Sequence, residues 1–281
     1  MTPTYFTLTI SLMNIEVFNK ELVNVNRWFQ VNKLSVNAKK TNYMLLGTKK
    51  NTKPEYNLQL YLNSDRHSTV RTPLEKVPST KFLGLQIDQN ITWKEHIDNI
   101  VKTCSRNVGI INKLKNFLPH EALYTLYCSL ILPYINYGIL AWGCACSSYI
   151  NDLFKIQKRA LRIISASDYR SSTNPLLIRY NTLSVRDMYT FELGLFMYKH
   201  DNGLLPSVFD DLFIKQSKIH DLNTRNKDRL RLPFIKRAFC EKSIKYAGTK
   251  LWNNVDNSIK SSSSINQFRH VFKKHLMQSY Y

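Results

Sequence analysis

The spacing of hydrophobic residues along the chain changes near residue 90. Before that point a helix is predicted over 14–32, because apolar side chains recur there every three or four residues. Three short apolar runs follow, at 43–47, 58–62 and 81–87, and the last two alternate with polar residues as half-buried strands do. This part of the chain is therefore expected to combine one helix with strands.

After residue 90 the spacing is mostly that of helices. A stripe of apolar residues from Trp93 to Leu114 predicts a long helix, and Pro119 suits the first turn of the next one. The remaining predicted elements are helices over 153–164 and 184–200, a short strand over 229–233, and two final helices separated by a loop and N-cap at 261–264.

One segment is uncharged for long enough to cross a membrane. No charged residue lies between Glu121 and Asp152, whereas about 20 apolar residues span a bilayer. Tyrosines interrupt this segment, Pro133 breaks it, and it becomes small and polar from Gly143 onward. We therefore expect a buried helical hairpin whose second arm starts at Pro133, and no membrane partner. A membrane-associated segment over 122–151 is the alternative.

The charge of the chain indicates an anionic partner. The chain has 281 residues, with 40 Lys and Arg against 20 Asp and Glu, which gives a formal net charge of +20. Such an excess repels itself unless polyphosphate or an anionic membrane lies nearby. With 43% hydrophobic and 12% aromatic residues the chain can still bury a core, which excludes disorder as its main state.

The cysteines indicate a reducing compartment. There are five, an odd number, and the sequence from Met1 onward does not have the pattern of a signal peptide. The chain is therefore expected to be intracellular, in the nucleus or cytoplasm, and not secreted. Cys144 and Cys146 have no second Cys or His pair at zinc-site spacing, so we expect buried apolar cysteines and no metal site.

Basic residues gather on one edge of the helix predicted over 153–164. The four cations are Lys155, Lys158, Arg159 and Arg162. They follow one another at helical spacing, opposite the apolar stripe, and no carboxylate follows Asp152 on this helix. Such an edge suits contact with a phosphate backbone, and a solvated helix face is the ordinary alternative.

Two further basic segments lie toward the end of the chain. Arg229 and Arg231 share one side of the predicted short strand. On the final helix Arg269, Lys273 and Lys274 oppose an apolar face. None of the three basic segments interleaves cations with aromatic residues, as a binding platform for single strands does. We therefore expect phosphate contacts and not base recognition.

The acidic residues offer little for metal-dependent chemistry. Two-metal phosphoryl transfer needs carboxylates that bridge ions about 3.5–4 Å apart. The only adjacent aspartates, Asp210 and Asp211, follow an aromatic residue, as they do in a polymerase active-site hairpin. They also follow Pro206, and a proline before acidic residues is typical of the first turn of a helix. We interpret the pair as a helix start.

Several stretches, taken in order, resemble a known family. Residues 24–41 contain a Trp-Phe pair followed by Asn-Lys-Leu-Ser-Val-Asn-Ala-Lys-Lys-Thr, and residues 80–88 read Thr-Lys-Phe-Leu-Gly-Leu-Gln-Ile-Asp. They resemble the fourth palm motif and the primer-grip hairpin of reverse transcriptases from non-LTR retrotransposons of the LINE-type, jockey-like group. Later stretches that resemble the family's helical thumb and C-terminal region are 132–143, 156–164, 246–253 and 268–276.

The resemblance implies an α+β fold in four parts. Residues 1–13 would be a truncated or non-native start, and 14–90 a palm remnant with a small partial β-sheet and one helix. Residues 91–170 would form a mostly α-helical thumb, and 171–281 a C-terminal helical region. The family's catalytic aspartates precede the first helix, and residues 1–13 contain no Asp or Glu. We therefore expect a remnant of an RNA-directed DNA polymerase without turnover of its own.

The resemblance also implies a partner and site residues. The expected partner is RNA or DNA template–primer, held through its phosphates. The intact family uses Mg²⁺, but this fragment is expected to hold no metal or cofactor. No catalytic residue is expected. Lys40 matches only a vestigial auxiliary position, where a polymerase lysine is proposed to protonate the departing pyrophosphate.

Among the other matching positions, Phe82, Leu83 and Gly84 fall at the primer grip, and plain strand core is the alternative for the first two. The expected nucleic-acid-binding residues are Lys33, Lys39, Lys155, Lys158, Arg159, Arg162, Arg229 and Arg231. Two other functions stay open. One is an active reverse transcriptase whose carboxylates come from elsewhere, with Asp210 and Asp211 as candidates. The other is a non-catalytic interaction or membrane-associated protein that uses the fold without nucleic acid.

Overall fold

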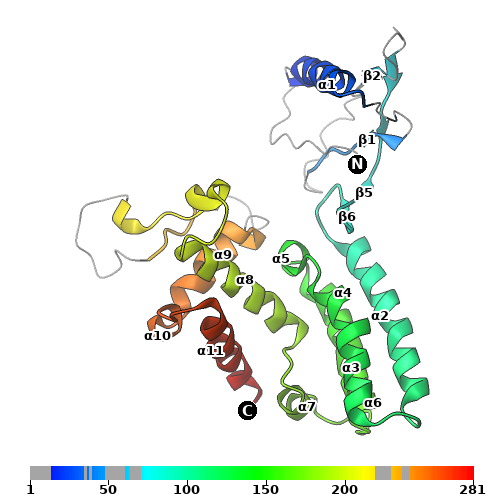
Figure 1. The fold of residues 1–281 in the computed structure, drawn as a ribbon, viewed down its shortest axis with the longest axis vertical. Helices are drawn as coiled ribbons and strands as arrows, with labels where there is room; N and C mark the ends of the chain where they lie inside the picture. Colours follow the sequence, from blue (N-terminus) through cyan, green and yellow to red (C-terminus); the bar gives the residue numbers. More distant parts are fainter. Residues whose placement is uncertain are drawn as a thin grey trace. The chain divides into compact units, whose positions relative to one another are not determined.

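The computed structural model describes residues 14–34, 37, 40–47, 61–63, 71–218, 229–235 and 241–281 (Figure 1). Predictions that fall on Lys39 or on 58–60 lie outside the described residues. The chain divides into two compact units, Met1–Trp93 and Lys94–Tyr281. In the described residues the first unit combines one long helix with short strands and the second consists mainly of helices, which confirms the α+β fold class.

Helix α1, Asn14–Val31, is closed at its end by backbone hydrogen bonds. The Leu34 N–H donates to the Phe29 carbonyl at 2.8 Å, and the Lys33 N–H donates to the Gln30 carbonyl at 3.1 Å. These two bonds define a Schellman motif, whose left-handed position is usually a glycine. Lys33 occupies that position here with φ 57°. The chain therefore leaves the helix at Lys33 with some backbone strain.

The strands in the part of the first unit that the structure describes pair in twos. β1, Asn42–Tyr43, pairs in parallel with β4, Glu75–Lys76. The other two ladders are antiparallel: β2, Tyr61–Asn63, with β3, Arg71–Pro73, and β5, Ser79–Phe82, with β6, Leu85–Asp88. Two-stranded ladders have little independent stability in water, so these strands depend on local turns and on what packs against them.

The β5–β6 ladder corrects one prediction. Alternation over 81–87 predicted a single strand, but the chain reverses between Phe82 and Leu85, which face each other across the ladder. Leu83 and Gly84 form the two-residue turn, with φ 45° and φ 83°. Positive φ at both positions is the mark of a type I′ turn, the connection that matches the twist of a hairpin. This hairpin is what the family resemblance implied.

Asp88 organises the end of the first unit. Its carboxylate accepts hydrogen bonds from the backbone N–H groups of Thr92 at 2.9 Å and Trp93 at 2.8 Å, and from the Thr92 hydroxyl at 3.0 Å. The N–H of Asn90 donates to the same carboxylate at 3.1 Å. This cap holds Ile91 and Trp93 at positive φ, of 50° and 63°. One side chain therefore fixes the path of the chain out of β6.

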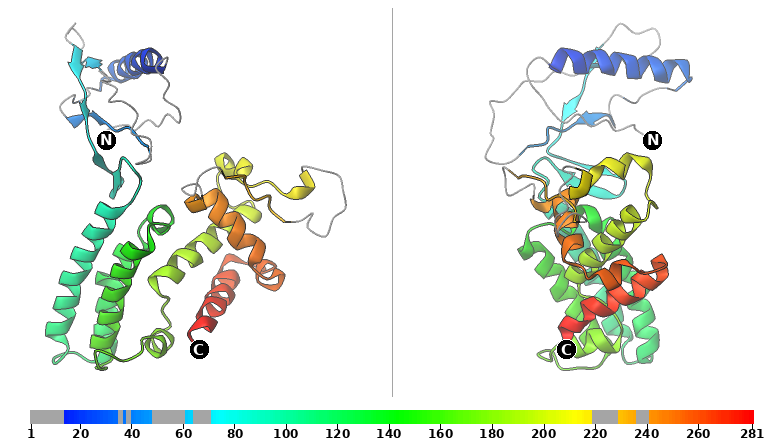
Figure 2. Two further views of the ribbon diagram at one scale, coloured as in Figure 1. Left: turned by 180° about the vertical axis from the view of Figure 1, so that it is seen from behind. Right: turned by 90° about the vertical axis from the view of Figure 1, so that its left-hand side faces the viewer.

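The second unit starts with helices that lie side by side (Figure 2). They are α2, Lys94–Leu114, α3, His120–Leu130, and α6, Ser147–Ile164. The buried stripe of α2 includes Ile97, Cys104 and Val108, each 0–1% exposed, and it packs mainly against α6. Pro119 is the N-cap residue of α3, one position before its predicted place in the first turn.

The uncharged segment folds back on itself in more pieces than predicted. Pro133 does lie in the first turn of a second arm, but that arm consists of two short helices, α4, Leu132–Asn136, and α5, Ile139–Trp142. Gly138 separates them with φ 63°, a conformation that glycine adopts without strain. Trp142 is fully buried. In the described part of the chain no helix combines the length and the apolar character that crossing a membrane requires.

The rest of the second unit is a further group of helices. The longer ones are α8, Val185–Asp201, α9, Ile244–Asn254, and α11, Ile265–Met277. The shorter ones are α7, Asn174–Arg179, α10, Asn257–Lys260, and the 3₁₀ helices η2, Ser207–Leu212, η3, Gln216–Lys218, and η5, Gln278–Tyr280. As predicted, serines separate the last helices: Ser264 is an N-cap whose side chain accepts the Gln267 N–H.

Aromatic side chains fill the core between α8, α9 and α11. Phe268 is fully buried and stacks on Tyr198, with ring centroids 4.5 Å apart, and on Phe272 at 5.2 Å. Trp252 tilts against the same Phe268 ring at 6.0 Å. Gly194 lets α8 approach this cluster, because a Cβ added there would lie 2.2 Å from the Phe272 ring.

Candidate nucleic-acid interface

Helix α6 has one buried face and one basic face. Leu153, Ala160, Leu161 and Ile164 are fully buried. Their spacing leaves the predicted basic residues on the opposite side, where Lys155 and Arg159 are exposed and Lys158 is half-exposed. The buried face fixes the orientation of the cations, because a rotation of the helix about its axis would expose the apolar side chains to water.

A buried glutamine fixes this orientation further. Gln157 is fully buried on α6, and its Nε2 donates to the Tyr127 hydroxyl at 3.0 Å and to the Leu183 carbonyl at 2.8 Å. Its Oε1 accepts the N–H of Val185 at 3.0 Å, at the start of α8. Burial raises the pKa of the Tyr127 phenol, which keeps this hydroxyl neutral. Three elements are therefore joined through one carboxamide.

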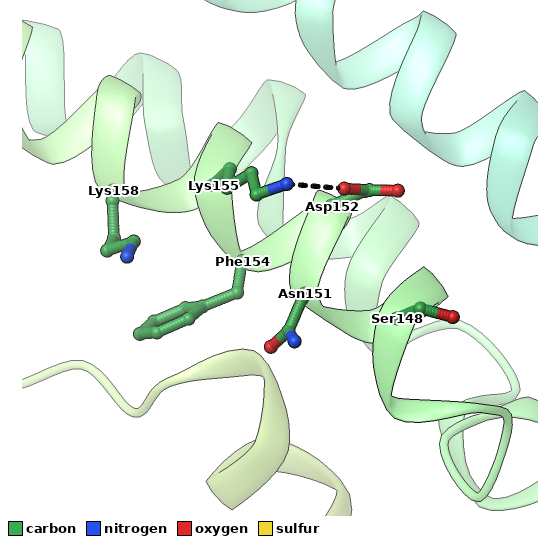
Figure 3. Close-up of a pocket in the computed structure, with 6 residues that line it drawn as sticks. All are labelled: Ser148, Asn151, Asp152, Phe154, Lys155 and Lys158. Atoms are coloured by element: carbon green, nitrogen blue, oxygen red, sulfur yellow. Dashed lines mark hydrogen bonds and ion pairs between the residues drawn. The ribbon is translucent and has the colours of Figure 1, made fainter.

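The cation nearest the start of α6 has a weak partner. Lys155 Nζ lies 2.8 Å from Asp152, and the two side chains are 71% and 57% exposed. Such an exposed ion pair contributes little stability, so a phosphate can replace the carboxylate at small cost. The pair borders an open hollow of about 290 Å³, drawn in Figure 3. Its lining residues are Ser148, Asn151, Asp152, Phe154, Lys155 and Lys158.

Lys158 and Arg159 differ in their surroundings. Lys158 Nζ lies over the Phe154 ring, 4.7 Å from its centroid, and both side chains point to the same side of α6 in Figure 3. Arg159 is exposed and, within the described residues, has no ion pair. Asn151, at the other end of the hollow, accepts a hydrogen bond from Arg186 of α8, which adds another exposed cation to this side.

Arg162 has a role that sequence reasoning missed. Its Nε and Nη2 donate to the carbonyl of Ser171 at 3.0 and 2.7 Å, and its guanidinium lies 5.9 Å from the centroid of the Tyr169 ring. The side chain therefore holds the loop after α6 in addition to carrying charge. No local signal in the sequence pairs Arg162 with a carbonyl nine residues later, because the contact depends on how the loop turns back.

The other predicted basic residues of the second unit lie in two places. Arg229 and Arg231 are both exposed, on either side of Leu230, which is 3% exposed and forms an isolated antiparallel bridge with Lys215. On α11, Lys273 donates to the Asn181 carbonyl, and desolvation lowers the pKa of its ammonium group. Arg269 and Lys274 of α11 are exposed.

Lys33 and Lys40, in the first unit, stand at backbone turns. Both side chains are exposed. The Lys40 N–H donates to the Asn37 carbonyl at 3.0 Å and to its side-chain oxygen at 3.2 Å, and the Thr41 hydroxyl donates to the same carbonyl at 2.9 Å. These hydrogen bonds to Asn37 fix the backbone at Lys40. Lys39 lies outside the described residues.

The predicted primer-grip residues form the hairpin tip described above. Phe82 is half-buried, whereas Leu83 is 71% exposed and Gly84 is exposed. The alternative that Leu83 is strand core is therefore wrong: the turn directs its side chain to solvent. A leucine at φ 45° is unusual, because a Cβ makes this backbone region unfavourable.

The adjacent aspartates do not form a strand hairpin. Asp210 and Asp211 are exposed on the 3₁₀ helix η2, which follows Pro206, so the predicted helical turn is confirmed in 3₁₀ form. Phe209 packs edge-on against Phe196, with centroids 5.5 Å apart. Across the described ranges, no three His, Cys, Asp or Glu side chains meet in a way that could hold a metal ion.

The cysteine prediction is partly wrong. Cys104 is fully buried, but Cys146 is exposed just before α6 and Cys144 is half-buried. The Ser148 hydroxyl donates to the Cys146 sulfur at 3.3 Å, and this bond is the main cause that lowers the pKa of its thiol. The Cys-Ala-Cys spacing does not reveal that the second cysteine lies outside the packed segment.

Comparison with known proteins finds relatives among the RNA-directed DNA polymerases of mobile elements. It is 22% identical over 210 residues to the probable RNA-directed DNA polymerase from transposon X-element of Drosophila melanogaster. It is 28% identical over 99 residues to the RNA-directed DNA polymerase from mobile element jockey of the same species. These matches cover 73% and 34% of this chain. The chain is therefore similar to RNA-directed DNA polymerases of Drosophila mobile elements.

This confirms the predicted resemblance to reverse transcriptases of jockey-like, non-LTR retrotransposons. A third relative, the probable RNA-directed DNA polymerase from transposon BS of Drosophila melanogaster, is 27% identical over 99 residues. The matched stretches cover only 19% of the X-element polymerase and 11% of the jockey polymerase. No protein-family model matches the chain, and no solved structure matches it.

Proposed function

We propose that this chain holds template–primer nucleic acid through phosphate contacts along the basic face of α6, and that it does not itself transfer nucleotides. The observation that carries the proposal is the outward row of Lys155, Lys158 and Arg159, held in place by the buried Gln157 on the opposite side. The curated relatives are named as RNA-directed DNA polymerases, which work on nucleic acid.

Electrostatics supports phosphate contact. Each cation that neutralises a phosphate releases condensed counterions, and this release supplies sequence-independent affinity. The helix carries one carboxylate, Asp152. Because its ion pair with Lys155 is exposed and weak, a phosphate can replace this carboxylate at small cost. The chain has a net charge of +20, which adds long-range attraction to any polyanion.

The second half of the proposal concerns chemistry. Nucleotide transfer needs carboxylates that bridge two metal ions. Asp210 and Asp211 are the adjacent pair in the sequence, but they stand exposed on η2, where the aromatic residue before them packs into the helical region. We assign nucleotide transfer to carboxylates that this chain does not supply. Magnesium-dependent incorporation of a nucleotide by the purified chain would refute this assignment.

Salt dependence is the first test of binding. The affinity of the chain for a primer–template duplex should fall steeply as salt rises, with a slope of about −0.9 per phosphate contact in a plot of log K against log salt. A flat response would contradict phosphate contact and favour an interaction protein that does not use nucleic acid.

Charge reversal locates the contact. Lys155→Glu with Arg159→Glu should lower the affinity for all sequences alike and reduce the salt slope by about two. Lys245→Glu with Lys250→Glu on α9 is the matched control, because it changes net charge equally at exposed positions on another helix. Arg162 is left unchanged because it bonds Ser171. Equal losses in both variants would show a general charge effect and not a site on α6.

A further inference from the structure

Two aromatic rings and two cations follow one another along α6 and the loop behind it. Phe154, Lys158 and Arg162 are four residues apart, so they share one ridge of the helix. Lys158 lies over the Phe154 ring at 4.7 Å, and Arg162 lies 5.9 Å from the Tyr169 ring centroid. The order in space is aromatic, cation, cation, aromatic. Sequence spacing does not reveal this order, because Tyr169 reaches the ridge only through the loop.

The loop presents Tyr169 in a defined position. Tyr169 is 77% exposed, which is unusual for so large a ring. Arg162 lies over it and is itself fixed by two hydrogen bonds to Ser171. The backbone after α6 is also tied down, because the Ser167 N–H donates to the Arg162 carbonyl at 3.0 Å. The ring is therefore available to a ligand at little ordering cost.

Phe154 lies at the other end of the row. It is half-buried and lines the open hollow beside Lys155 and Lys158, where Figure 3 shows its ring on the same side as Lys158. The α-helical rise of 1.5 Å per residue separates Phe154 from Arg162 by about 12 Å along the axis. This length corresponds to about three or four nucleotides stacked at about 3.4 Å each.

We propose that this row, which we call the stacking row (Phe154, Lys158, Arg162 and Tyr169), binds unpaired nucleotides by stacking their bases on Phe154 and Tyr169. The inference rests on the proposed function and assigns this row to the unpaired segment of the template–primer. Bases in a duplex are covered by their neighbours, so only an unpaired segment can place them on these rings. Lys155, Lys158 and Arg159 take the phosphates alongside. The proposal adds base stacking to the predicted phosphate contacts.

The test separates bases from phosphates. Two ligands are compared: an oligothymidylate of roughly twelve nucleotides, within the usual range of single-strand sites, and an abasic strand of equal length and charge. The wild-type chain should prefer the oligothymidylate. Phe154→Leu with Tyr169→Leu should remove this preference, with a loss of roughly five-fold or more per ring on the oligothymidylate and little change on the abasic strand.

Controls keep the result interpretable. Tyr134→Leu changes an exposed tyrosine on α4 and should leave the preference intact. If circular dichroism shows that Phe154→Leu disturbs the fold, Tyr169→Leu alone decides, because its ring is 77% exposed. Equal wild-type affinity for both strands, or equal losses on both in the variant, would overturn the stacking row and leave the phosphate proposal standing. Binding of a primer–template duplex but of neither single strand would also overturn the stacking row alone, whereas failure to bind the duplex as well would overturn the proposed function itself.

Discussion

The two units of the chain owe their geometry to different forces. In the described part of the second unit, Tyr127, Trp142 and Phe268 are fully buried. The least exposed apolar side chains described in the first unit are Phe29, Leu74 and Trp93, at 8%, 9% and 8%. The second unit is therefore held by packing, whereas the strands described in the first unit pair in twos and gain less from burial.

The difference shows in the candidate residues. In the second unit the cations of α6 are aimed by a buried stripe and by Gln157. In the first unit Lys40 is placed by a turn at Asn37, and Leu83 by a two-residue hairpin turn. Local hydrogen bonds can position a side chain without a large core, but they open more easily than packed helices do.

The largest expected effect comes from the aromatic core. Phe268→Ala removes a fully buried ring that stacks on Tyr198 and Phe272, and we expect it to lower the free energy of unfolding by about 3–5 kcal/mol. Phe29→Ala in the first unit should cost less, about 1–2 kcal/mol, because fewer buried neighbours surround that ring. Urea unfolding followed by peptide-resolved hydrogen exchange measures both. Equal costs would remove the contrast between the units.

The next effect concerns the buried carboxamide. Gln157→Leu keeps the volume but leaves the Tyr127 hydroxyl, the Leu183 carbonyl and the Val185 N–H without this partner. We expect a loss of about 3 kcal/mol in the free energy of unfolding. Gln278→Leu, at an exposed position of η5, is the matched control and should be near neutral. An unchanged free energy of unfolding in Gln157→Leu would mean that packing alone orients α6.

A smaller effect, of opposite sign at neighbouring positions, is expected in the hairpin of the first unit. Gly84→Ala places a Cβ at φ 83° and should destabilise the hairpin by about 1–2 kcal/mol. Leu83→Gly relieves a leucine at φ 45° and should stabilise it by up to about 1 kcal/mol. Amide exchange in β5 and β6 measures the change. A Leu83→Gly variant that exchanges faster would show that the leucine side chain itself stabilises the turn.

The smallest effect is a dependence on pH. His96 is 7% exposed and packs edge-on against Trp142, and burial lowers the pKa of its imidazole below the ordinary value. The unfolded chain therefore binds a proton at higher pH than the folded chain does. Stability from this residue is present above about pH 6.5 and is lost as pH falls through the folded pKa.

A difference measurement isolates this contribution. Carboxylates also change charge in acid, so the unfolding free energies of the wild-type chain and of His96→Phe are compared between pH 7 and pH 5. The wild-type chain should lose more stability than the variant over this range. Parallel curves would mean that the imidazole titrates as it does in the unfolded chain.

Helices were the part of this fold that the sequence predicted well. Apolar spacing placed a helix from Ser184 to His200, and the structure has α8 over Val185–Asp201 with Ser184 as its N-cap. Apolar periodicity predicted this helix correctly because helix formation is determined mainly by residues close in sequence. Over 81–87 the same method failed, since alternation continues through a two-residue turn without a break in polarity.

The candidate site could be predicted only in part. The row of cations on α6 follows from helical spacing alone. The bond from Arg162 to Ser171, and the position of Tyr169 beside Arg162, depend on a loop that turns back on the helix. The exposure of Cys146 likewise depends on where the packed segment ends. Long-range contacts of this kind leave no periodic signal in the sequence.

The side chain of Tyr280 connects distant parts of the second unit. The Tyr280 hydroxyl donates to the Asp187 carboxylate and accepts the Ser184 N–H at 2.8 Å, so the phenol lies at the first turn of α8. A protease that cuts after Ser279 would detach this phenol from the helices before it. That single cut would then loosen a helix that begins nearly a hundred positions earlier.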